Sequence, residues 1–255
     1  MSDFLPDYAG ASVQPSPNHG ERVGVSAPDS IILHYTGMES AERALSWLCD
    51  PESQVSSHYL VFEDGHVIQM VPESRRAWHA GKSFWAGEID LNSRSIGIEI
   101  ANGGHPAGLP DFPKAQIDAV AELCRDCGAR WSIAPERVLA HSDIAPVRKV
   151  DPGEKFPWDI LSQKGVGHWV KPAPIGGGRF FQRGDSGQPV EALQSMLSLY
   201  GYGVEISGSY CEKTEGAVAA FQRHFRPALV DGIADFSTID TLHRLISQLP
   251  KFKRA

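Results

Sequence analysis

The chain has 255 residues, of which 42% are hydrophobic and 22% are charged, and its formal net charge is −7. This composition is ordinary for a globular protein, and the length suits one large domain or a medium domain with a small one. The acidic balance argues against a nucleic-acid partner, because phosphate binding requires a basic surface. No apolar run approaches the roughly 20 residues needed to span a bilayer.

The first half of the chain predicts alternating strands and helices. Residues 1–25 are rich in Pro, Ser, Gly and Asn, so we expect an irregular N-terminal arm. Residues 30–36 (SIILHYT) read as a short buried strand that contains His34, and residues 41–49 have helical spacing. Two apolar runs, 57–62 and 66–71, flank Glu63-Asp64-Gly65, and an Asp-Gly pair between strands is typical of a hairpin.

The next segments continue the alternation. Residues 95–102 (SIGIEIAN) predict a strand with Glu99 in its middle, and residues 114–128 predict an amphipathic helix that Gly128 ends. Residues 137–141 predict a further strand. The stretch 139–153 (LAHSDIAPVRKVDPG) is expected to be a strand end followed by a loop, because Pro146 and Pro152 exclude a regular helix. The interleaving favours an α/β fold.

Two cysteines in the predicted helix, Cys124 and Cys127, form a CxxC pair. A redox or metal-binding role is one interpretation. The alternative is two small helix residues, one of which faces the core. The chain has no second CxxC pair, which favours this alternative.

The composition changes at residues 171–178 (KPAPIGGG), which resemble a linker. We therefore divide the chain into a domain of residues 1–170, a linker of residues 171–178 and a module of residues 179–255. The module contains three short amphipathic segments separated by glycine-rich turns, which predict three helices. Its size lies near the lower limit for a self-sufficient core.

Three polar side chains at or just beyond strand ends, His34, His141 and Asp151, could bind a metal or move a proton. Two imidazoles and a carboxylate are a familiar ligand set for catalytic zinc. Their spacing alone is a weak signal, and any one histidine could instead be a hydrogen-bonded structural residue. Glu99 on its apolar strand could be a general base or a core partner of an arginine. Lys149 could stabilise an oxyanion or lie solvated on the surface.

Five motifs in chain order resemble the zinc-dependent N-acetylmuramoyl-L-alanine amidases, and specifically the AmpD-type branch of the amidase type 2 family. The motifs are HYTG (34–37), SSHYLV (56–61), RAWHAG (76–81), SIGIEIAN (95–102) and HSDIAPVRKVDPG (141–153). The resemblance implies a mixed central β-sheet flanked by helices, with zinc in a groove on one side. It also implies Zn²⁺ as the cofactor and the hydrolysis of the amide between N-acetylmuramic acid and L-alanine by zinc-activated water. The substrates would be peptidoglycan or 1,6-anhydro-muropeptides.

The resemblance also assigns roles to individual residues. The zinc ligands fall on His34, His141 and Asp151, the base on Glu99 and the oxyanion-stabilising lysine on Lys149. We expect four further residues to contact substrate. Trp78 and His79 would line the groove, Asn102 would hydrogen-bond the stem peptide, and His58 would be either a contact or a structural residue.

The C-terminal segment resembles a peptidoglycan-binding type 1 domain, which would bind glycan or the sacculus. The matching stretches are RGDSGQPVEALQSMLSLYGY (183–202), TEGAVAAFQRHF (214–225) and DGIADFSTIDTL (231–242). Phe236-Ser237 departs from the family's usual turn before the final threonine. This departure lies in a loop and puts the strength of glycan binding in question.

Three other functions stay open at this point. The chain could recognise muropeptides without cleaving them, although such proteins typically lack a metal ligand, and Asp151 is present. It could be a zinc peptidase that cuts within the stem peptide. It could also serve mainly to anchor itself to the wall through its C-terminal module. The N-terminal sequence has no visible secretory signal, so we expect a cytoplasmic protein, with the periplasm as the alternative that a wall-binding module suggests.

Overall fold

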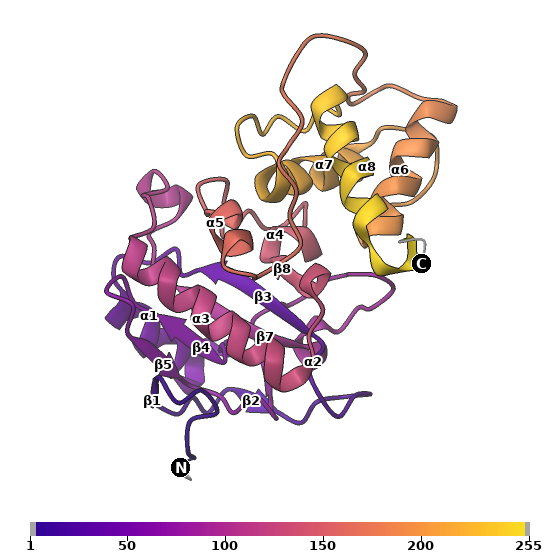
Figure 1. Cartoon of the computed structure of the whole chain (residues 1–255). Coiled ribbons are helices and arrows are strands. Elements are labelled where there is room, and N and C mark those ends of the chain that lie inside the picture. The colour runs from indigo at the N-terminus through magenta and orange to yellow at the C-terminus, as the bar shows by residue number, and fades with distance from the viewer. Residues whose placement is uncertain (1–3, 253–255) are drawn as a thin grey trace.

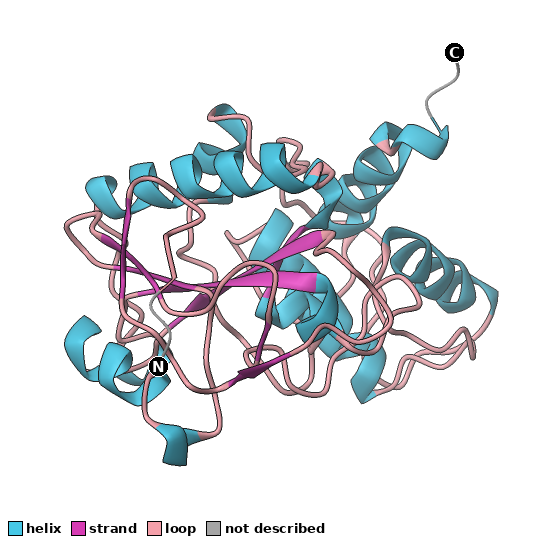
Figure 2. Ribbon diagram, turned by 90° about the horizontal axis from the view of Figure 1, so that it is seen from below, coloured by secondary structure: helices cyan, strands magenta, loops and turns pink. Residues whose placement is uncertain are grey.

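A computed structural model describes residues 4–252 and contains one mixed sheet of six strands with helices on both faces (Figure 1; Figure 2). The sheet order is β1-β5-β4-β7-β3-β8. Its strands are β1 (Ala11–Val13), β3 (Ser30–Tyr35), β4 (Tyr59–Val61), β5 (Val67–Gln69), β7 (Ser95–Ile100) and β8 (Val138–Ala140). Strands β4 and β5 pair antiparallel, and the other neighbours are parallel. The expected α/β fold with a mixed sheet is confirmed.

A second, two-stranded sheet joins β2 (His19–Gly20) to β6 (Arg76–Ala77). The α-helices are α1 (Ala41–Leu48), α2 (Leu91–Arg94), α3 (Lys114–Trp131), α4 (His141–Ile144), α5 (Trp158–Gln163), α6 (Gln188–Tyr200), α7 (Glu212–Phe225) and α8 (Phe236–Gln248). Short 3-10 helices span Pro51–Ser53, His105–Ala107, Pro135–Arg137 and Pro250–Phe252. Within residues 4–252, none of these helices combines the length and the apolar character needed to cross a bilayer.

Three local expectations differ from the structure. Residues 11–13 of the expected irregular arm form β1, which adds a parallel edge strand beside β5. Helix α3 does not end at Gly128, because its apolar face continues to Trp131 and the left-handed residue that ends it is Ser132, with φ of 54°. The residues after β8 do not enter a loop directly, since His141 begins the single turn of α4 before Pro146 stops it.

One face of the sheet packs against α3. Alternate residues of β3 and β7, such as Leu33 and Ile98, share a buried core with Val120 and Cys124 of α3. Both Cys124 and Cys127 are buried there as free thiols, so both face the core. Burial raises the pKa of Cys124 to about 12, which disfavours the thiolate needed for metal or redox chemistry.

Two groups of helices cover the opposite face of the sheet, α1 at one end and the C-terminal helices at the other. Leu45 of α1 packs over β4 and β5 in one buried cluster with Leu60. At the other end, Ile32 of β3 and Leu139 of β8 belong to the same buried cluster as the C-terminal helices. Side chains alternate along a strand, so His34 and Glu99 lie on this same face. The candidate site therefore lies between α1 and the C-terminal helices.

The three predicted C-terminal helices form, and they share a core with the sheet domain. Trp85, only 2% exposed, lies in the same buried cluster as residues of α6, α7 and α8. The start of the expected linker is also fixed, because Ser237 donates to the Ala173 carbonyl and Thr241 accepts from the Ala173 amide. The boundaries at residues 170 and 179 stay a prediction.

Candidate metal centre and groove

The register of three parallel strands brings distant residues to one edge of the sheet. In the β3–β7 pair His34 lies opposite Glu99, and in the β3–β8 pair Leu33 lies opposite Ala140. His141 follows Ala140 directly, so it reaches the carboxyl edge beside His34. This edge is where open α/β sheets place their ligands.

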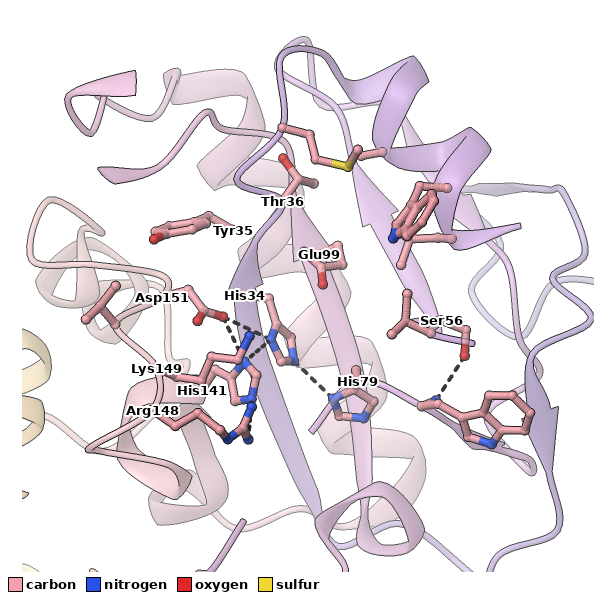
Figure 3. A pocket seen from close by; sticks show the side chains of 17 residues that line it. His34, Tyr35, Thr36, Ser56, His79, Glu99, His141, Arg148, Lys149 and Asp151 are labelled. Carbon is pink, nitrogen blue, oxygen red and sulfur yellow. Dashed lines mark hydrogen bonds and ion pairs between the residues drawn. The ribbon is translucent and has the colours of Figure 1, made fainter. Parts of the chain in front are cut away.

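The loop after α4 returns Asp151 to the same point. The Ser142 amide donates to the Asp151 carbonyl, which closes the loop onto α4. Asp151 Oδ2 then lies 3.0 Å from His141 Nδ1 and 3.1 Å from His34 Nδ1. The two Nδ1 atoms are 2.9 Å apart, and all three residues are buried (Figure 3). These three residues form the only metal-capable group found among residues 4–252.

The hydrogen bond of the outer nitrogen fixes the tautomer of His141. His141 Nε2 lies 3.1 Å from the carbonyl oxygen of Ala80, which can only accept, so this nitrogen carries the proton. A neutral His141 therefore turns the lone pair of Nδ1 toward Asp151.

A chain of hydrogen bonds fixes His34 in the same way. The Ser95 hydroxyl donates to the Leu91 carbonyl, so it must accept from His79 Nε2, 3.2 Å away. His79 Nδ1 is then an acceptor and receives the proton of His34 Nε2 at 3.0 Å. This leaves the lone pair of His34 Nδ1 facing the site.

The close packing of His79 on the sheet depends on Gly97 of β7. A Cβ atom at Gly97 would lie 2.5 Å from the His79 ring. No side chain fits at position 97 while His79 keeps this place, so the glycine holds the ring within reach of His34.

The site thus gathers two imidazole lone pairs and a carboxylate oxygen, with no donor among them. Burial lowers the pKa of His34 to about 4, so the neutral ring is favoured. Three hydrogen-bond acceptors in mutual contact repel one another unless a cation lies between them. These three ligand atoms therefore suit a metal ion.

Glu99 supplies a second reactive group. Its Oε2 atom is buried and has no hydrogen-bond partner among the described residues. Burial, and secondarily the charge of Asp151, raises the pKa of Glu99 well above its ordinary value, while Lys149 opposes the shift. Perturbed carboxyls of this kind concentrate at functional sites.

These groups lie in one groove of about 560 Å³, a volume typical of ligand sites. Of the residues expected to form the site, seven line it: His34, Trp78, His79, Glu99, His141, Lys149 and Asp151. In Figure 3, Glu99 of β7 lies above His34, whereas Lys149, from the loop after α4, lies beside His141 and below Asp151.

The structure does not bring His58 and Asn102 to this groove. His58 is fully buried, accepts from the Gly97 amide at Nδ1, and lies 3.0 Å from the Arg75 carbonyl at Nε2. Asn102 lines a neighbouring pocket, and its amide is engaged by the Pro110 carbonyl and the Gly104 amide. Both side chains therefore hold backbone segments in place.

Several other residues line the groove and were not predicted from the sequence, among them Trp47, Ser56 and Arg148. Trp47 is 48% exposed on the outer side of α1, although its neighbours Ala44 and Leu48 are buried. A tryptophan outside the apolar face of an amphipathic helix could have indicated a binding role. Ser56 accepts a hydrogen bond from the Trp78 amide, and Arg148 donates one to the Ala80 carbonyl. The positions of Ser56 and Arg148 in the groove depend on these contacts between distant residues, which no local sequence pattern predicts.

Comparison with known proteins identifies the family of the chain. Residues 24–154 match the family described as N-acetylmuramoyl-L-alanine amidase, and residues 186–242 match a peptidoglycan binding domain. The N-acetylmuramoyl-L-alanine amidase AmiD of Escherichia coli K12 is 41% identical over 223 residues, which are 82% of this chain and 78% of that protein.

Two solved structures resemble this chain over most of its length. One is AmiD of E. coli in complex with the substrate anhydro-N-acetylmuramic acid-L-Ala-D-gamma-Glu-L-Lys, with a TM-score of 0.75, 36% identity and coverage of 91% of this chain and 98% of that one. The other is AmpDh3 of Pseudomonas aeruginosa in complex with anhydromuramic pentapeptide, with a TM-score of 0.69, 28% identity and coverage of 94% and 97%. On this evidence, the chain belongs to the N-acetylmuramoyl-L-alanine amidase family and carries a C-terminal peptidoglycan binding domain.

Proposed function

We propose that this protein hydrolyses the amide between the lactyl group of N-acetylmuramic acid and the L-alanine of the stem peptide, with zinc as its metal. The observation that carries the proposal is the meeting, in one groove, of a His-His-Asp acceptor cluster with the unpartnered carboxylate of Glu99. The substrate bound to AmiD and the anhydromuramic pentapeptide bound to AmpDh3 support muropeptides as the substrate class.

His34, His141 and Asp151 would hold the zinc. A zinc ion in such a site acts as a Lewis acid that polarises the amide carbonyl and makes water more acidic. The hydrogen bonds from His34 to His79 and from His141 to the Ala80 carbonyl orient both imidazoles and raise their basicity as ligands.

Glu99 is the proton carrier of the reaction. Its carboxylate takes a proton from the attacking water as the new C–O bond forms at the carbonyl carbon. It then gives that proton to the alanine nitrogen as the C–N bond breaks, because an amide nitrogen leaves only when it is protonated. The raised pKa of Glu99 suits this double role, since it favours return of the proton.

Lys149 stabilises negative charge on the carbonyl oxygen during the attack. Its side chain lines the groove beside Asp151, and its positive charge lowers the pKa of Glu99. A fixed ammonium group aimed at a developing oxyanion lowers the barrier to amide hydrolysis.

Two tryptophans offer surfaces for the sugar or the peptide. Trp47 and Trp78 lie in the wall of the groove, and Trp47 is half exposed. Aromatic faces suit stacking against sugar rings, and they leave the polar groups at the base of the groove free for the amide.

The C-terminal module would bind glycan or the sacculus. The match of residues 186–242 to a peptidoglycan binding domain supports this role. Because the module shares a core with Ile32 and Leu139, its deletion would uncover buried surface of the sheet domain. Sacculus pull-down with single surface variants of α6, α7 and α8 is therefore the informative test. The cytoplasmic location stays a prediction, and cell fractionation decides between it and the periplasm.

Product analysis tests the proposed reaction. Purified protein is incubated with a defined 1,6-anhydro-muropeptide and, separately, with sacculi, and the products are weighed by mass spectrometry. We expect an intact stem peptide beginning at L-alanine and a peptide-free sugar. Products cut within the stem peptide would indicate a peptidase, and binding without any product would indicate a recognition protein.

A further inference from the structure

A buried carboxylate lies two residues beyond the candidate ligand His141. Asp143 is 0% exposed in the single turn of α4, and its Oδ2 accepts the Ala140 amide at 2.8 Å. This bond caps the helix turn at the point where His141 begins it. The position of Asp143 is therefore coupled to the direction of the His141 side chain.

The other partners of Asp143 come from the C-terminal module. Tyr202, just after α6, donates its hydroxyl to Asp143 Oδ1 at 2.6 Å. His224 of α7 places Nδ1 2.7 Å from Asp143 Oδ2. Tyr202 is 1% exposed and His224 is 2% exposed, so water cannot replace either partner without repacking.

These two donors are held firmly. The His224 ring stacks on Trp158 with centroids 3.7 Å apart, and Trp158 belongs to the sheet domain. On the other side, Trp85 packs edge to face against Tyr202 at 5.0 Å, and the Ala86 amide donates to the Gly201 carbonyl. The contact between module and sheet domain is thus built from specific aromatic and polar pairs.

We propose that the C-terminal module is a positioning part of the metal site, in which Tyr202 and His224 fix Asp143 and thereby aim His141. This inference rests on the proposed function, because it assigns the module a task at the same site in addition to wall binding. Loss of a donor leaves a buried carboxylate oxygen underpaired, which favours a shift of α4. A shift of a few tenths of an ångström in α4 moves a ligand out of its coordination geometry.

The test compares two Tyr→Phe variants of the C-terminal module, each of which removes one hydroxyl group. Tyr202→Phe removes the donor to Asp143. Tyr210→Phe is the matched control, because Tyr210 is 1% exposed and donates to the Gly232 carbonyl at 2.6 Å, inside the module. The readouts are the zinc dissociation constant from competition with a chelator, the visible spectrum of the Co²⁺-loaded protein, and kcat and KM on an anhydro-muropeptide.

We expect Tyr202→Phe to weaken zinc binding by about tenfold, the low end of the range for direct partners of a ligand, because Tyr202 acts through Asp143. We also expect it to change the Co²⁺ spectrum and to lower kcat with little change in KM. Tyr210→Phe lowers the melting temperature but keeps the wild-type zinc affinity and spectrum. Wild-type zinc affinity and spectrum in Tyr202→Phe would overturn the inference.

A second pair of variants tests the donor at His224. His224→Asn keeps an N–H near the position of Nδ1, whereas His224→Leu removes it, so we expect zinc affinity to be higher in the asparagine variant. Equal losses in the two variants would contradict a role for the donor. If the wild-type protein cleaves muropeptide and the Tyr202→Phe variant binds zinc as tightly as wild type, this inference is wrong and the proposed function stands. If the wild-type protein does not cleave muropeptide, the proposed function is wrong.

Discussion

His79 Nδ1 accepts the proton of His34 Nε2 at 3.0 Å, on the side of the His34 ring away from Asp151. This relationship determines which nitrogen of His34 is free to bind a metal. It also gives His79, which lines the groove, a role in metal binding, although His79 is not one of the three clustered residues.

Replacing His79 should therefore weaken zinc binding. We expect His79→Ala to raise the zinc dissociation constant by about 10- to 100-fold, the usual effect of losing an outer-shell partner. Competition with a chelator measures it. His66→Ala is the control, since His66 is exposed, its ring contacts Ser12 and Phe62, and it does not line the groove. Equal zinc affinity in wild type and His79→Ala would show that His34 does not need this bond.

Glu99→Gln removes the proton carrier and keeps the shape of the side chain. We expect kcat to fall by about 10²- to 10⁴-fold, the range for loss of a general acid–base group. The zinc dissociation constant should stay within a few-fold of wild type, because Glu99 is not one of the three clustered residues. A variant that keeps its zinc and at least a tenth of the wild-type kcat would rule out the proposed role.

The pH dependence of the reaction should report the same carboxyl. Only ionised Glu99 can accept the proton, so kcat/KM falls as the pH drops through its pKa, which burial raises. Lys149 opposes that shift, so Lys149→Met should raise the pKa of Glu99 further and move the acid limb of the profile to higher pH. Lys213→Met, on the exposed side of α7, is the control and should leave the limb in place. An acid limb that does not move in Lys149→Met would contradict the electrostatic contact.

His58 makes stability depend on pH. Burial, followed by the charge of Arg22, lowers the pKa of His58 from 6.5 to about 3. The unfolded chain therefore binds a proton between these values that the folded chain does not. The stability contributed by neutral His58 is fully present above pH 6.5 and is lost as the pH falls toward 3, by at most about 1.4 kcal/mol per pH unit.

Denaturant unfolding at several pH values between 4 and 6.5 tests this. We expect the free energy of unfolding of His58→Gln to be lower than that of wild type at pH 6.5 but to fall less steeply as the pH drops. His243→Gln, an exposed residue of α8, should keep the wild-type slope. Identical slopes in wild type and His58→Gln would mean that His58 is not held neutral.

The sequence predicted the sheet and most of the groove for identifiable reasons. The apolar strands 30–36 and 95–102 are short and strongly patterned, and they carry His34 and Glu99. Lys149 and Asp151 lie in the motif 141–153, which follows the predicted strand 137–141. Gly128 misled the prediction because packing of α3 against the sheet extends the helix past a residue of low helix propensity.

Contacts between distant segments could not be predicted. His58 belongs to a motif, but its role depends on the Gly97 amide and the Arg75 carbonyl, which only the folded sheet brings to it. The link from Tyr202 to Asp143 joins residues 59 positions apart. The Pro/Gly composition of residues 171–178 indicated a separate module, whereas Trp85 and the C-terminal helices form a shared core.

The most direct test of the proposed function is a digest of a defined muropeptide by the purified protein, first with a chelator and then after zinc is restored. We expect the chelator to abolish release of the stem peptide that begins at L-alanine, and zinc to restore it. Release that continues unchanged in the chelator, with protein shown to be free of metal, would contradict catalysis at His34, His141 and Asp151.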